Sequence, residues 1–74
     1  MPNTKLIEAL NRELAVNKLQ HVQMLVGMRK GRYTVKFTYV DTDRIRAKLK
    51  AITERYCENL ALVEEKKTTI IYAI

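Results

Sequence analysis

Residues 32–40, RYTVKFTYV, carry the clearest pattern in the chain. Aromatic and β-branched residues alternate there with polar or charged ones, which predicts a half-buried β-strand with one apolar face. That face consists of Tyr33, Val35, Phe37 and Tyr39. The next stretch, DTDRIRAKLKAITERY at 41–56, changes to a helical period. Its apolar stripe consists of Ile45, Leu49, Ile52 and Tyr56. Asp41-Thr42-Asp43 offers an N-cap, so we expect a helix from residue 43 or 44 to about residue 59.

The region before that strand allows two interpretations. Residues 4–16 predict an amphipathic helix that Asn3 or Thr4 can cap. Residues 18–28 alternate as a strand, which a hairpin turn at 29–32 would join to the next strand. The side chains on one side of it are Val22, Met24, Val26 and Met28. The same residues also fit helical spacing, and the alternative is one long helix over residues 4–30, followed by strand, helix, strand and strand.

Residues 60–63 and 68–74 predict two more strands around a charged turn at 64–67. The preferred order is helix, strand, strand, helix, strand, strand, an α+β two-layer sandwich with both helices on one face of the sheet. This order resembles a circularly permuted ferredoxin-like domain, in which the first strand has moved to the C-terminus. The last residues, TIIYAI, are apolar almost throughout, as in a central strand. Alternatively they form an edge strand that pairs with a second chain.

Composition indicates one small domain over residues 1–74. The chain has 74 residues, of which 47% are hydrophobic and 30% charged, which excludes intrinsic disorder and low-complexity classes. A core of this size is marginal, so a homodimer is a reasonable expectation. One cysteine, Cys57, precludes an internal disulfide and fits a reducing compartment. No segment approaches the roughly 18 apolar residues of a membrane span, and the N-terminus lacks the apolar core of a signal peptide. We expect a cytoplasmic protein without membrane contact.

The basic excess is confined to one part of the chain. Residues 29–55 hold nine basic and three acidic residues, a net charge of +6, while the rest of the chain holds five of each sign. This concentration favours a contiguous positive surface. We therefore expect a small basic regulatory or accessory protein that binds nucleic acid, DNA or RNA, mainly through the phosphate backbone. The candidate binding residues are Arg29, Lys30, Arg32, Lys36, Arg44, Lys48 and Arg55.

Part of this basic region resembles the RNP1 signature of RNA-recognition motifs. The matching positions are Lys30, Gly31, Val35 and Phe37. Arg32 and Thr34 occupy the two positions that would hold stacking aromatic residues. The resemblance implies a similar strand in a similar sheet, and the departure implies contact with the backbone rather than stacking on bases.

The sequence shows no catalytic or metal-binding set. His21 and Cys57 are single residues without the context of a nucleophile motif, and capping accounts for Asp41 and Asp43. We expect no enzyme activity, no cofactor and no metal. One alternative is a protein-interaction module or inhibitor, of the kind that phages and mobile elements encode, which binds an acidic surface of a partner protein. Another is a small toxin-like ribonuclease.

Overall fold

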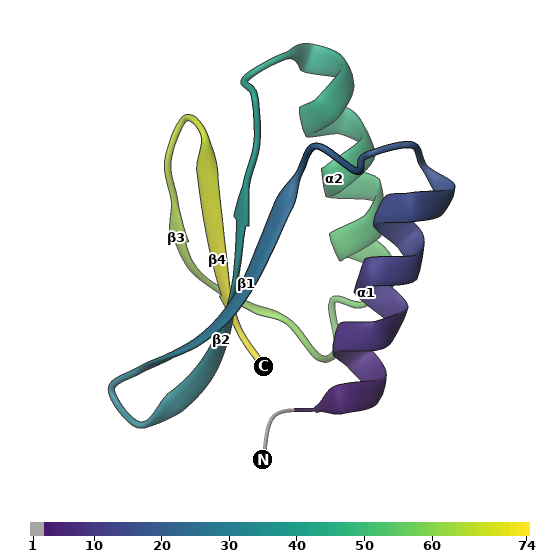
Figure 1. Ribbon diagram of the computed structural model, residues 1–74. Helices are drawn as coiled ribbons and strands as arrows, with labels where there is room; N and C mark the ends of the chain where they lie inside the picture. Colours follow the sequence, from purple (N-terminus) through teal and green to yellow (C-terminus); the bar gives the residue numbers. More distant parts are fainter. Residues whose placement is uncertain (1–2) are drawn as a thin grey trace.

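The computed structural model of the protein describes residues 3–74, which form two helices and one four-stranded antiparallel sheet (Figure 1). In chain order the elements are α1 (Thr4–Val16), β1 (Gln23–Arg29), β2 (Arg32–Thr38), α2 (Asp43–Arg55), β3 (Ala61–Glu65) and β4 (Thr69–Ala73). Both helices lie on the same face of the sheet. The expected α+β class is confirmed. Neither helix in this part of the chain has the length and apolar character needed to cross a membrane.

Side chains fix where the two helices begin. Asn3 Oδ1 accepts a hydrogen bond from the backbone N–H of Leu6 at 3.2 Å, and Thr42 Oγ1 accepts one from the N–H of Ile45 at 3.2 Å. Each bond satisfies an amide that the first helical turn leaves unpaired, so both predicted caps are confirmed. α2 ends at Arg55 rather than at residue 59, because the chain turns at 56–59.

Residues 18–22 form the connection between α1 and β1. Lys18 has a φ of 59°, a left-handed conformation that cannot continue a helix, and the Leu19 N–H donates back to the Leu14 carbonyl at 2.8 Å. β1 then begins at Gln23, five residues later than the sequence pattern predicts, because the chain first turns to bury Leu19 and Val22. The alternative of one long helix over residues 4–30 is therefore wrong.

The strand order β1-β2-β4-β3 places the C-terminal strand inside the sheet. β4 pairs with β2 on one side and with β3 on the other, where a bulge interrupts the register between Leu62 and Glu64. The alternative that residues 69–74 are a free edge pairing with a second chain is therefore wrong. β4 is apolar almost throughout because side chains on both of its faces are buried or partly buried: Ile71 and Ala73 are buried on the face without helices, and Tyr72 packs partly against the core on the helix face.

The core fills the space between the helices and the sheet. Phe37 and Val35 of β2 are fully buried, and the Phe37 ring meets Tyr72 edge to face with centroids 6.3 Å apart. The helices contribute Leu6, Leu10, Leu14, Ile45, Leu49 and Ile52. Burial of each large apolar side chain contributes about 1.5–3 kcal/mol. The helical stripe expected around Leu49 thus forms the core, with Tyr56 packed partly against it.

The outer half of the β1–β2 hairpin extends away from both helices, toward the lower left of Figure 1. Of the apolar side chains on β1, only Met24 packs against the core. Leu25, Val26 and Met28 are 56%, 43% and 60% exposed. Strand alternation was predicted correctly here, but the helices are too far from the hairpin end to cover its apolar residues.

Candidate nucleic-acid interface

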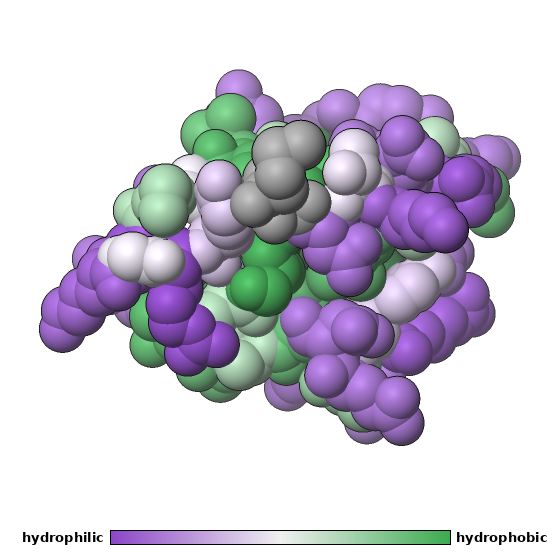
Figure 2. Space-filling view, turned by 90° about the horizontal axis from the view of Figure 1, so that it is seen from below, coloured by the Kyte–Doolittle hydropathy of each residue, from purple (hydrophilic) through white to green (hydrophobic). Residues whose placement is uncertain are grey.

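Three candidate residues, Arg29, Lys30 and Arg32, lie at the end of the β1–β2 hairpin and are called the tip cluster. Lys30 and Gly31 form the turn itself, with φ values of 52° and 79°, as a two-residue type I′ hairpin turn requires. Arg29 and Arg32 face each other across the last rung of the ladder. Figure 2, seen from below, shows hydrophilic side chains projecting at the left, where this hairpin ends. The predicted turn is confirmed, and it carries three basic residues beyond the body of the sheet.

Lys36 lies on the open face of the sheet, away from the helices. It stands between Leu25 of β1 and Ile71 of β4, and it lines a shallow hollow of about 220 Å³ that Arg29 also borders. Arg29 Nη1 lies 3.8 Å from Oε1 of Glu64, a residue of the opposite edge strand. The twist of the sheet thus brings the hairpin end over the open face. Glu64 offsets part of the positive charge of the tip cluster.

A second group of basic residues gathers where α2 begins. Arg44 and Lys48 lie one turn apart on α2 and line a hollow of about 410 Å³ with Lys18 and His21, which precede β1. These four residues are called the helix-end cluster. The rest of the lining consists of Leu19, Thr42 and Ile45, so none of the described residues around this hollow is acidic. Lys48 Nζ donates to the Asn17 carbonyl at 3.0 Å, which ties α2 to the end of α1.

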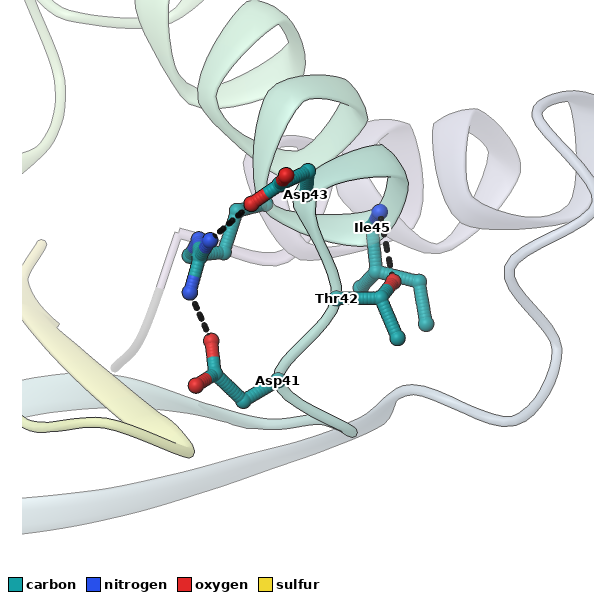
Figure 3. A network of polar contacts seen from close by, with 5 residues as sticks. Asp41, Thr42, Asp43 and Ile45 are labelled. Carbon is teal, nitrogen blue, oxygen red and sulfur yellow. Dashed lines mark hydrogen bonds and ion pairs between the residues drawn. The ribbon is translucent and has the colours of Figure 1, made fainter.

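The two acidic residues nearest to the start of α2 are paired with one arginine. Asp41 and Asp43 each accept a hydrogen bond from the guanidinium of Arg46, and both carboxylates point toward it in Figure 3. Thr42, between them, turns its hydroxyl toward the Ile45 amide instead. Arg46 therefore offsets one of these two negative charges, and the positive end of the helix dipole adds to the field of the helix-end cluster.

Arg55 lies eleven residues along α2 from Arg44, about 16 Å along the helix axis. Its guanidinium is 3.0 Å from a carboxylate oxygen of Glu13 on α1, and the Tyr56 hydroxyl lies 3.5 Å from the same oxygen. The helical wheel groups Arg55 with Arg44 and Lys48 on one side of α2. That side faces α1 and uses Lys48 and Arg55 to hold the two helices together.

The seven candidate residues consequently do not form one group: three lie in the tip cluster, two lie in the helix-end cluster, and Lys36 and Arg55 lie outside both. The tip cluster lies at the lower left of Figure 1 and the start of α2 at the top, with Lys36 on the sheet between them. Sequence reasoning missed Lys18 and His21 as members of the helix-end cluster. Nothing in their immediate neighbours indicates this role, because only the packing of residues 18–22 against α2 brings them to Arg44.

A third hollow, of about 350 Å³, lies between α2 and the β3–β4 side of the sheet. Its lining includes Arg46 and Lys50 but also Asp43 and Glu65, so its charges balance. Burial, together with the nearby Glu65 carboxylate, raises the pKa of Tyr39 above its ordinary value of 10.0. With its mixed charge, this hollow is a weaker candidate for binding a polyanion than the helix-end cluster.

Across residues 3–74, no three His, Cys, Asp or Glu side chains converge as metal ligands. Cys57 is exposed and not in a disulfide. Comparison with known protein families, curated proteins and solved structures finds no match. The geometry and charge of the clusters described above therefore carry the functional proposal.

Proposed function

We propose that the protein binds nucleic acid through the phosphate backbone, as a regulatory or accessory protein rather than an enzyme. The observation that carries this proposal is the hollow of the helix-end cluster. Three basic side chains, Lys18, Arg44 and Lys48, and one histidine surround it, and its described lining holds no acidic residue. Clustered cations of this kind attract polyanions and gain free energy from the counterions that each bound phosphate releases.

The tip cluster supplies a second contact of the same chemistry. Lys30 and Arg32 lie at the end of a hairpin that projects beyond the helices, while Arg29 shares its charge with Glu64. Lys36 extends this positive surface along the open face of the sheet. The positions that would stack on bases in an RNA-recognition motif are Arg32 and Thr34, and Thr34 is buried. The proposed contact is therefore with phosphates rather than bases.

The fold and the cellular location belong to the same proposal. We infer a circularly permuted ferredoxin-like domain, since moving the first strand of that fold to the end of the chain generates the strand order β1-β2-β4-β3. We place the protein in the cytoplasm, where an exposed unpaired thiol such as Cys57 stays reduced.

Salt-titrated binding to duplex DNA and to single-stranded RNA tests the proposal. Arg44→Gln should weaken binding and lower the slope of log K against log salt by about 0.9 for duplex DNA or about 0.7 for a single strand. Arg12→Gln is the matched control, because Arg12 is an exposed arginine on α1 outside both clusters. It should leave affinity and slope near those of the unmodified protein.

Two results would contradict the proposal. One is the absence of binding to either nucleic acid at about 50 mM salt, where phosphate contacts are strong. The other is equal weakening by Arg44→Gln and Arg12→Gln, which would show only an effect of net charge. In the first case the same cations would be candidates for an acidic protein surface, the second class of partner that the charge distribution suits.

A further inference from the structure

Residues 23–28 of β1 form an exposed, uncharged and largely apolar strand edge. β1 is the last strand on its side of the sheet, and every residue of it except Met24 is exposed. Residues 23–28, QMLVGM, contain no charge and no proline. Strand edges of this kind pair readily with other strands, and proteins usually block them with charges, prolines or bulges.

The opposite edge of the sheet is protected in that way. β3 carries Glu64 and Glu65 and has a bulge between Leu62 and Glu64, which interrupts regular pairing. The two edges of one small sheet thus differ in the features that prevent edge-to-edge association. This difference singles out β1 as a binding edge.

The backbone hydrogen bonds show which groups of β1 point outward. The Tyr33 carbonyl accepts from the Ile74 N–H at 3.0 Å, and the Tyr39 N–H donates to the Thr68 carbonyl at 2.9 Å. Odd-numbered residues of β2 therefore direct their polar groups toward β4, and even-numbered residues direct theirs toward β1. In the β1–β2 register, the β1 residues opposite odd-numbered partners direct their N–H and C=O groups away from the sheet. These residues are Met24, Val26 and Met28.

We propose that a second copy of this chain binds there, so that the two β1 strands pair antiparallel around a two-fold axis at Val26. This register joins the outward groups of Val26 to those of Val26 in the second copy, and those of Met24 to those of Met28. On the helix side the three side chains form one apolar row across the junction. On the open side Leu25 lies over Gly27 of the other copy, which has no side chain. A Cβ atom built on Gly27 would have Thr34 Oγ1 as its nearest neighbour, at 3.7 Å, which is an ordinary van der Waals distance.

Self-pairing also unites the two basic clusters. They lie at opposite ends of β1, since the tip cluster begins at Arg29, the last residue of β1, and His21 precedes Gln23, the first. Antiparallel pairing sets Arg29 of one copy opposite Gln23 of the other, so each tip cluster lies beside the helix-end cluster of its partner. Two composite basic surfaces result. Their use in binding rests on the proposed function, whereas strand pairing itself does not.

Val26→Lys tests the pairing, because it would place two lysines directly opposite each other at the axis. Val63→Lys is the matched control, since Val63 lies on the other edge strand and has the same exposed fraction, 43%. Sedimentation over a concentration series should show the unmodified protein and Val63→Lys approaching twice the 8.7 kDa chain mass. Val26→Lys should stay at the mass of one chain, with an unchanged circular dichroism spectrum.

Amide hydrogen exchange in the unmodified protein provides a second measurement, independent of any variant. Dilution should speed exchange at Met24, Val26 and Met28 at least tenfold and leave Gly27, which bonds within the chain, unchanged. The proposal is overturned by a single-chain mass at all concentrations, by a dimer that Val26→Lys leaves intact, or by exchange that does not change with concentration. None of these readouts contains nucleic acid, so failure of the dimer and failure of the proposed function are distinguishable.

Discussion

Removal of the last five residues, 70–74, should abolish folding of the isolated chain. β4 lies between β2 and β3, so the deletion removes the connection between the two hairpins as well as the side chains of the strand. Ile71 and Ala73 are 7% and 2% exposed, while Ile70, Tyr72 and Ile74 pack partly against the core. At about 1.5–3 kcal/mol for each of the four large side chains, with the three partly buried ones counted at about half, the loss is roughly 4–8 kcal/mol.

That loss is comparable to the whole free energy of unfolding. A domain of this length is stable by roughly 4–11 kcal/mol. The truncated chain should therefore lose its helical circular dichroism signal and its cooperative urea transition. A truncated chain that keeps a cooperative transition within 2 kcal/mol of the full chain would refute the central position of β4.

A point substitution tests the same prediction with a smaller change in stability. Ile71→Ala should destabilise the protein by about 2–4 kcal/mol, although the side chain lies on the sheet face that carries no helix. Leu62→Ala is the control, because Leu62 is 56% exposed on the neighbouring strand, and it should cost less than about 1 kcal/mol. Equal effects of the two substitutions would show that the open face does not bury Ile71.

Two further outcomes are expected. Lys30 has a φ of 52° in the type I′ turn, a position where asparagine is preferred, so Lys30→Asn should raise the thermal unfolding midpoint slightly. The same substitution should lower nucleic-acid affinity, because it removes a charge of the tip cluster. A lower unfolding midpoint would contradict the turn geometry. Tyr39 should ionise above pH 10.0 in an alkaline ultraviolet titration, and Tyr39→Phe should remove that step. Because its pKa is raised, the stability from its neutral form is fully present below pH 10.0 and is lost as pH rises through the folded-state pKa.

Much of the fold could be predicted because local chemistry decides it. The caps at Asn3 and Thr42, the alternation in 32–38 and the Lys30-Gly31 turn each depend on residues within one turn or one strand. Residues 18–28 were ambiguous because their apolar spacing satisfies both periods. The left-handed Lys18 and the burial of Leu19 decide between them, and the burial of Leu19 in the core depends on distant elements.

The candidate site was predictable only in part, because its members come from separate elements. The charge count pointed to the hairpin turn and to the start of α2, where the structure groups basic side chains. It could not show that Arg55 pairs with Glu13, 42 residues earlier in the chain, or that Lys48 bonds to the Asn17 carbonyl. It also could not bring Lys18 and His21 to Arg44, since that proximity requires the folded loop.

The place of β4 in the sheet also constrains the order in which the molecule can fold. Thr34 pairs with Ala73, 39 residues later, so the rungs that join the two hairpins close only after a large part of the chain has been ordered. During synthesis the β1–β2 hairpin emerges well before its partner and exposes two unpaired edges for that interval. We expect folding to be slow for a domain of this size. The chain should be most prone to aggregation before β4 joins the sheet.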